Sequence, residues 1–378
     1  MNKASDRLEE IQKTIKEYVE GNTAQHVGVV TGVISPDAPN GQLLFAGERN
    51  FWNSQNQHMS LTGDTLFEIA SITKVFTSLL VYIGNSTIDF YGGTLGQFFT
   101  ALSPTAPVAK IPILDLANYS PGLPQDNHGG FWPARTMDNL SNLLTWLDNY
   151  QPPASPGQYY SYSNLGWSLI GMAACSISSE QDDYTTLYGS MVSELGRDFQ
   201  MTNTQLISQS LVPNLPLGHD KSGNPIQPNQ YASLAPMLLG AGAIVSTGND
   251  MMKWLSGNMG YGPVAENILK TQQSPRYTLP KLSDPKVSGP TVSIGWFVHA
   301  VNVDGQTVYY LAKDGGLAGF TSWMGFQTWD FVTPSPIGTF VLTNSHGAAE
   351  LGQKIMNILF GIAPPEKFEA PEGMLPLD

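Results

Sequence analysis

The chain has 378 residues, and its 41% hydrophobic content is enough for a large core in one domain or in two intergrown domains. The formal charge of −13 argues against nucleic acid as a partner, because phosphate contacts depend on clustered Lys and Arg. No apolar run approaches the roughly 18 residues that a membrane-spanning helix needs, so we expect a soluble globule.

The first element is a predicted helix over residues 1–20, because apolar residues recur there at helical spacing, at Leu8, Ile11, Ile15 and Val19. This charged helix is not a signal peptide. We therefore expect either a cytoplasmic protein or an exported one whose signal is missing from this chain. The strand-like runs 26–35 and 42–51 follow, and the Pro, Asn and Gly between them predict a hairpin turn.

The far end of the chain has the same character. Strand-like runs at 292–303, 307–316, 321–329 and 337–345 predict an antiparallel meander, which a helix over 348–362 closes. Helical patterns separated by Pro- and Gly-rich loops dominate the middle. We therefore expect an α+β fold in which an antiparallel sheet is flanked by helices. The predicted sheet domain comprises residues 1–79 and 281–378, and a mostly helical lobe is inserted at 80–280.

The stretch EIASITKVFTSLL, residues 68–80, carries Ser71 and Lys74 at the expected start of a helix. Residues three apart share a helix face, so the amine would lie beside the hydroxyl, near the free N–H groups of the helix start. The alternative is that Ser71 only caps the helix and that Lys74 is solvated. The same spacing at Ser283 and Lys286 falls in a proline-containing turn and predicts no site. Gly-x-Ser-x-Gly does not occur, which excludes the nucleophile elbow of α/β-hydrolases.

Tyr162 and Asn164 stand two residues apart just before a predicted helix. A phenol acts as a base near neutral pH only if positive charge lowers its pKa, and Lys74 could supply that charge. The alternative is an aromatic loop that packs on the following helix, with Tyr159 and Tyr160 as local competitors.

Two Lys-x-Gly segments could supply a third element. Lys221 lies among turn residues and predicts an exposed turn. Lys313 ends a strand and precedes Gly315 and Gly316, where small residues let a substrate lie against the strand and a free N–H could bind an oxyanion.

Other reactive residues give no competing site. The six histidines are scattered without metal-binding spacing, so we expect neither a metal nor a cofactor. The single cysteine, Cys175, lies in a helical pattern and predicts a packed thiol.

In chain order, SITK, YSN and KDGG resemble the three active-site elements of the serine β-lactamase and penicillin-binding protein superfamily. The Tyr-x-Asn element resembles the class C branch, which includes D-Ala peptidases, AmpH-like proteins and family VIII carboxylesterases. The segments LANYSPGLP, MTNTQL and GAGAIVSTGNDMMKW are also similar to family segments, so that the resemblance spans about residues 25 to 360.

The resemblance implies a role for each matching residue. Ser71 is the nucleophile, Lys74 hydrogen-bonds it and helps take its proton, and Tyr162 is the general base that later protonates the leaving group. Asn164 orients Lys74 and the substrate amide, and Lys313 adds positive potential and meets a substrate carboxylate. The N–H groups of Ser71 and Gly316 form the oxyanion hole, next to Gly315.

The resemblance also implies a small-molecule substrate: a β-lactam, a D-amino acid peptide or a small ester. Periplasmic or secreted location is implied if a signal was removed. Asp314 departs from the family, which usually has Thr or Ser after the lysine. Its charge would repel a substrate carboxylate unless the side chain turns away, which favours an ester or a cationic D-amino acid substrate. A non-catalytic penicillin-binding sensor domain is the alternative from another class.

Overall fold

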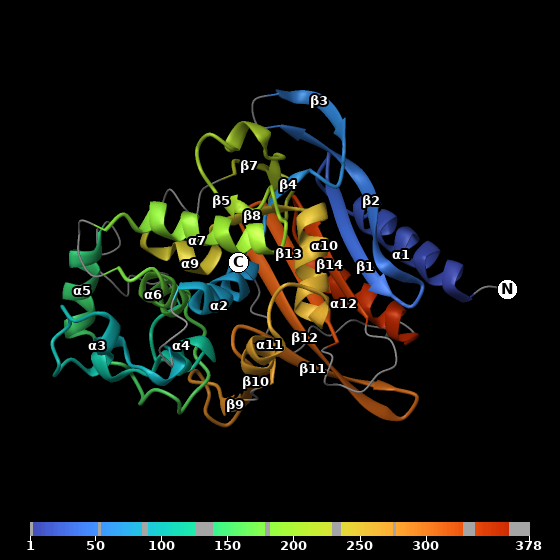
Figure 1. Cartoon of the computed structure of the whole chain (residues 1–378). Helices are drawn as coiled ribbons and strands as arrows, with labels where there is room; N and C mark the ends of the chain where they lie inside the picture. Colours follow the sequence, from blue (N-terminus) through green and yellow to red (C-terminus); the bar gives the residue numbers. More distant parts are fainter. Residues whose placement is uncertain are drawn as a thin grey trace.

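The computed structural model describes residues 3–51, 54–84, 90–125, 139–177, 182–228, 236–274, 277–327 and 337–362 (Figure 1). Within these residues an antiparallel sheet is flanked by helices, which confirms the predicted α+β class. None of the helices described there combines the length and apolarity that crossing a bilayer requires.

The main sheet joins the two ends of the chain. Its nine described strands lie in the order β3-β2-β1-β14-β13-β12-β11-β10-β9, and each neighbouring pair is antiparallel. The pairing of β1 with β14, with Val30 opposite Leu342, connects the N-terminal hairpin to the C-terminal meander. The strands are β1 (Gly28–Ser35), β2 (Ala38–Phe51), β3 (Ser54–Ser60), β9 (Tyr277–Pro280), β10 (Ser288–Val292), β11 (Phe297–Val303), β12 (Gln306–Leu317), β13 (Phe320–Phe326) and β14 (Gly338–Thr343).

Short strands form two smaller sheets in the described residues. One has the order β4-β8-β5 and the other pairs β6 with β7. These strands are β4 (Leu66–Glu68), β5 (Gln205–Leu206), β6 (Gly218–His219), β7 (Pro225–Ile226) and β8 (Ile244–Thr247). Because β4 immediately precedes Ser71, its pairing with β8 brings residues near 244 to the start of the Ser71 helix.

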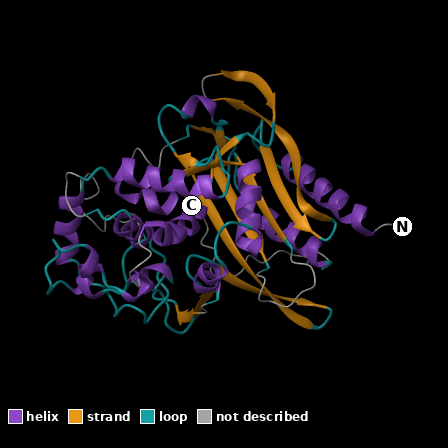
Figure 2. Ribbon diagram, viewed as in Figure 1, coloured by secondary structure: helices purple, strands orange, loops and turns teal. Residues whose placement is uncertain are grey.

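The helices lie on both faces of the main sheet. Their bounds are α1 (Lys3–Glu20), α2 (Thr73–Gly84), α3 (Leu95–Phe98), α4 (Ile113–Ala117), α5 (Leu140–Asn149), α6 (Asn164–Ala174), α7 (Tyr184–Asp198), α9 (Leu239–Gly242), α10 (Gly248–Ser256), α11 (Glu266–Gln273) and α12 (Ala348–Phe360). Short helical turns are η1 (Ala70–Ile72), η2 (Phe90–Gly92), η3 (Pro107–Lys110), η4 (Val212–Asn214), η5 (Pro236–Leu238) and η6 (Gly257–Tyr261). Figure 2 shows most helices gathered to one side of the long strands, with α1 on the other side.

Two apolar layers hold the helices to the sheet. On one face α12 contacts β13 and β14, and α1 contacts β2 and α12, with Ile11, Ile15 and Trp323 fully buried between them. On the other face a larger cluster includes Val75 of α2 and Phe340 of β14. Burial of this kind supplies most of the free energy that opposes chain entropy.

Most of the helices and strands named in the sequence analysis are present in the structure. The N-terminal helix, the first hairpin and the C-terminal meander with its closing helix correspond to α1, β1–β2 and β11–α12. Cys175 lies just after α6 and is half-buried; its Sγ is 3.4 Å from Sδ of Met191, and burial raises the pKa of the thiol to about 12. The division of the chain at residues 80 and 280 stays a prediction.

Gly352 of α12 tests how tightly this helix packs on the sheet. A Cβ added there would lie 2.3 Å from the ring of the buried Trp323. Alanine favours a helix by about 1 kcal/mol over glycine, but overpacking a rigid core costs about 1–3 kcal/mol. We therefore expect Gly352→Ala to lower the free energy of unfolding in a denaturant titration.

Gly189 of α7 is the matched control, because its added Cβ would make only ordinary contacts, at 3.7 Å to Leu206. Gly189→Ala should raise the free energy of unfolding by up to about 1 kcal/mol. Equal stabilisation by both substitutions would contradict the tight packing of α12.

Candidate active site

Ser71 lies in η1, between strand β4 and helix α2. The preceding residue, Ala70, has a φ of 47°, a left-handed conformation that costs a non-glycine residue about 1–3 kcal/mol. Two hydrogen bonds fix the backbone just before it: the Ile69 N–H donates to the Ile244 carbonyl at 3.0 Å, and the Ile69 carbonyl accepts from Ser322 Oγ at 2.8 Å. The surrounding sheets therefore hold the sharp turn that presents Ser71.

Ser71 and Lys74 do not behave as the helix-cap alternative predicts. The N-cap position of η1 is Ile69, and no side-chain cap hydrogen bond forms there. Ser71 is partly exposed, whereas Lys74 is completely buried. A buried lysine requires polar partners, because burying an unpaired ammonium is very unfavourable.

Lys74 has three such partners, from three parts of the chain. Its Nζ lies 2.9 Å from Ser71 Oγ, 2.8 Å from Asn164 Oδ1 and 2.7 Å from the Ala241 carbonyl oxygen. Asn164 is the first residue of α6, and Ala241 belongs to α9. The amine thus lies between the nucleophile candidate and two fixed oxygen acceptors.

The Tyr162 hydroxyl donates to Ser71 Oγ at 3.1 Å. Tyr162 precedes α6, where Ser163 is the N-cap and accepts from the Gly166 N–H at 2.9 Å. Its ring stacks on Tyr119, with centroids 5.0 Å apart, and the Lys74 Nζ lies 5.0 Å from the ring centroid. The competitor Tyr160 is instead tilted against Tyr119, at 6.3 Å.

Strand β12 brings the third element beside Ser71. A Cβ added at Gly315 would lie 2.5 Å from the Ile69 carbonyl oxygen and 3.0 Å from the Ser71 nitrogen, so only glycine allows this approach. Gly316 is the next residue of the strand and pairs with Thr321. Lys313 is 1% exposed, and its Nζ lies 5.6 Å from the Tyr162 ring centroid.

Burial and charge set the protonation of these groups. Burial, with a smaller contribution from the charge of Lys313, lowers the pKa of Lys74 well below the usual lysine value. Burial, followed by the charge of Asp314, raises the pKa of Tyr162 above the usual tyrosine value. These pKa shifts favour an uncharged amine and a protonated phenol, and both groups contact the hydroxyl of Ser71.

The weaker sequence candidates lie elsewhere. Lys221 is exposed in the turn between β6 and β7, and Ser283 and Lys286 are exposed in a turn before β10. Among the described residues, no group of three or more His, Cys, Asp or Glu side chains is arranged to hold a metal ion.

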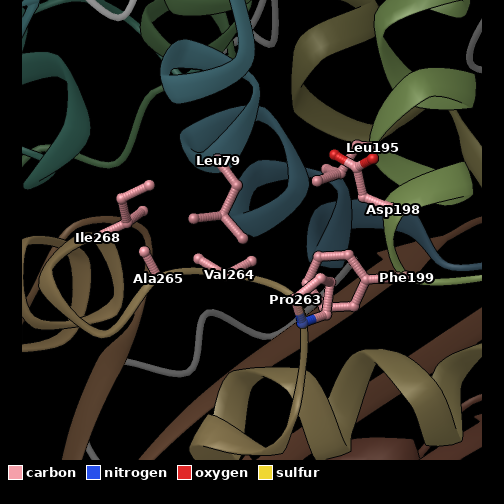
Figure 3. A pocket seen from close by; sticks show the side chains of 8 residues that line it. All are labelled: Leu79, Leu195, Asp198, Phe199, Pro263, Val264, Ala265 and Ile268. Carbon is pink, nitrogen blue, oxygen red and sulfur yellow. The ribbon is translucent and has the colours of Figure 1, made fainter.

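A cavity of about 520 Å³ lies between α2, α7 and α11 (Figure 3). Figure 3 shows Leu79, Val264 and Ile268 pointing into it, with Asp198 at one side. Leu79 stands eight residues after Ser71, which is about 12 Å along a helix. None of the candidate catalytic residues is among those that line the cavity, so it is separate from the site at Ser71.

Some residues that shape the site were not predicted from the sequence. Ala241 acts through its carbonyl oxygen, and Ser322 through its bond to Ile69. Tyr119 is buried between Tyr162 and Phe297 and has a φ of 60°. Its place in LANYSPGLP, a segment similar to the family's, was the one available indication that this position matters.

The sequence profile of the β-lactamase family matches residues 11–360, so the chain belongs to the β-lactamase family. This confirms the family expected from the three motifs.

Among individual relatives, the D-alanyl-D-alanine-carboxypeptidase/endopeptidase AmpH of Escherichia coli (strain K12) is 25% identical over 296 residues, which cover 74% of this chain and 71% of that protein. A β-lactamase of Pseudomonas fluorescens is 24% identical, over 68% of this chain and 69% of that one.

Solved structures share the fold. The D-alanine carboxypeptidase AmpC from Burkholderia cenocepacia superposes with a TM-score of 0.72 at 19% identity, over 95% of this chain and 99% of that one. A class C β-lactamase in complex with cefoxitin superposes with a TM-score of 0.73 at 16% identity, over the same shares.

The stack on Tyr119 predicts that this residue positions Tyr162. The Tyr119 hydroxyl also donates to the Gly295 carbonyl at 2.8 Å, which fixes its ring. Because an aromatic pair contributes about 0.5–1.5 kcal/mol, we expect Tyr119→Leu to reduce kcat for a p-nitrophenyl ester by up to about tenfold, with a smaller change in KM.

Tyr119→Phe is the matched control, since it keeps the stack and loses only the bond to Gly295. It should retain more of kcat than Tyr119→Leu. An equal loss in both variants would show that the hydrogen bond, rather than the ring stack, holds Tyr162.

Proposed function

We propose that the chain is a serine hydrolase that works through an acyl-enzyme, with Ser71 as the nucleophile. One observation carries the proposal: the amine of Lys74 and the phenol of Tyr162 both reach Ser71 Oγ, at 2.9 and 3.1 Å. A serine hydroxyl attacks a carbonyl only when a base removes its proton, and two titratable groups here contact it.

The contacts of a neutral Lys74 are compatible with a role as the base. A neutral amine has two N–H bonds and one lone pair. Asn164 Oδ1 and the Ala241 carbonyl are acceptors and match the two N–H bonds, which leaves the lone pair for the Ser71 proton. The lowered pKa of Lys74 agrees with this assignment, and the raised pKa of Tyr162 argues against the phenol as the initial base.

The same groups account for a complete cycle. Ser71 gives its proton to Lys74 as Oγ attacks the carbonyl carbon. When the tetrahedral intermediate collapses, Tyr162 protonates the leaving atom, and the resulting phenolate is stabilised by the ammonium of Lys74. Water then gives a proton to Tyr162 and attacks the acyl group, and Lys74 returns its proton to Ser71 as the acid leaves. All three groups end as they began.

The oxyanion of each intermediate would bind to the N–H groups of Ser71 and Gly316. The close approach of β12 to η1 at Gly315 supports this placement, because it brings the two backbones side by side. Donors of this kind are worth about 10²–10³ in kcat.

Three substrate types share the first half of this cycle: a β-lactam, a D-Ala-type amide and a small acyl ester. The names of the relatives support the first two, since they are β-lactamases and D-alanine carboxypeptidases. They also make a silent binding domain the weaker proposal, as does the retained contact among Ser71, Lys74 and Tyr162.

Intact-mass measurement tests the nucleophile. The protein should gain the mass of the acyl group after mixing with a penicillin or with p-nitrophenyl butyrate, or should turn the compound over. Ser71→Ala should abolish both, because the variant lacks the hydroxyl that contacts Lys74 and Tyr162. Ser283→Ala removes the serine of the exposed Ser-x-x-Lys pair and should change nothing. Adducts that persist in Ser71→Ala would refute the assignment.

Tyr162→Phe and Lys74→Met separate the proposed roles of the phenol and the amine. Because p-nitrophenolate leaves without a proton, this variant should acylate from p-nitrophenyl butyrate within about tenfold of the natural rate, whereas Lys74→Met should lose at least about 100-fold. The neutral amine is the reactive form, so the acylation rate should rise with pH through the pKa of Lys74, which lies well below the usual lysine value. That rise should remain in Tyr162→Phe. If it disappears with the phenol, Tyr162 is the base.

A further inference from the structure

Lys313 is paired with its own neighbour. Its Nζ donates to Asp314 Oδ1 at 3.1 Å and to the Asp314 carbonyl oxygen at 2.6 Å. The rest of its surroundings are aromatic, since Nζ lies 5.1 Å from the ring centroid of Phe297 and 5.6 Å from that of Tyr162. Lys313 is only 1% exposed, and the neighbouring carboxylate of Asp314 balances its charge.

Asp314 stays ionised in this pair. Burial opposes its charge, but the attraction of Lys313 outweighs burial and lowers the pKa of the carboxyl group. Its side chain retains 23% of its exposure, whereas that of Lys313 retains 1%. Of the two charges, the negative one is thus nearer to solvent.

The pair lies next to the reacting groups. Asp314 immediately precedes Gly315, the residue that approaches the Ser71 nitrogen. The negative charge of Asp314, about 3 Å from the Lys313 amine, offsets part of the attraction that Lys313 exerts on an anion there. An anion that approached from the solvent side would meet the Asp314 carboxylate first.

We propose that the Lys313–Asp314 pair makes Ser71 selective for uncharged esters and amides and disfavours substrates that carry a carboxylate beside the scissile bond. Asp314 is the residue that determines this selectivity. The inference rests on the proposed function, because it concerns substrates of the same serine.

A penicillin and its methyl ester provide a matched test, since they differ only in the carboxylate. The measured quantity is the ratio of their acylation rates, acid over methyl ester, from intact mass or lactam opening. In the natural chain the methyl ester should react faster. A faster reaction of the acid would overturn the proposal without any variant.

Asp314→Asn keeps the size of the side chain and leaves the charge of Lys313 unbalanced. We expect it to raise the acid-to-ester ratio by about tenfold or more, because a nearby charge then attracts the carboxylate. Asp314→Glu should retain the natural ratio. The ratio is the appropriate readout because any effect of Asp314 on Lys74 changes both rates alike.

Asp304→Asn is the matched control, since it makes the same change of charge at an exposed residue in the turn between β11 and β12. Its ratio should equal that of the natural chain. If Asp314→Asn does not fold, as judged by thermal unfolding, Asp314→Thr takes its place with the same expectation.

The outcomes separate the two proposals. If Ser71 is acylated but Asp314→Asn leaves the acid-to-ester ratio of acylation rates unchanged, the selectivity proposal fails and the acyl-enzyme function stands. If neither penicillin compound nor p-nitrophenyl butyrate acylates Ser71, the acyl-enzyme function itself fails, and the selectivity proposal fails with it.

Discussion

The buried amine of Lys74 is the interaction on which the site depends. An amine without water must find its partners in the protein, and its three contacts come from η1, α6 and α9. Two of these elements also have anchors of their own, since the β4–β8 pairing holds the segment before η1 and Ser163 caps α6. The buried nitrogen thus links segments that are up to 170 residues apart along the chain.

A second constraint acts on the backbone. Strand β12 can approach η1 only because Gly315 has no Cβ, and the left-handed Ala70 can persist only because Ser322 and Ile244 hold the peptide groups of Ile69. Strain of about 1–3 kcal/mol at one residue is small beside the burial of the surrounding core, which explains how the turn is tolerated. The backbone position of Ser71 is thus determined by the strands that pack around η1.

The sequence predicted the sheet and the terminal helices because their apolar residues follow strand or helix periodicity closely. It also predicted that Ser71, Lys74, Tyr162 and Asn164 would meet, because their motifs occur in the order typical of the family. The structure places these residues within hydrogen-bonding distance of one another. It could not reveal Ala241, whose contribution is a backbone oxygen, because every residue has one. Nor could it show the direction of the Asp314 side chain, which depends on where β12 places the amine of Lys313.

In the proposed mechanism, Asp314 connects substrate choice with proton transfer. In the proposed cycle, a positive charge forms on Lys74, near Lys313, when Ser71 gives up its proton, and repulsion between the two ammonium groups would oppose that step. The carboxylate of Asp314 offsets the repulsion, as its effect of raising the pKa of Lys74 shows. A neutral residue at this position would leave Lys313 free to attract an anionic substrate, but it would also make Lys74 a weaker base. The charge that is proposed to disfavour carboxylate substrates would therefore also support Lys74 as the proposed base.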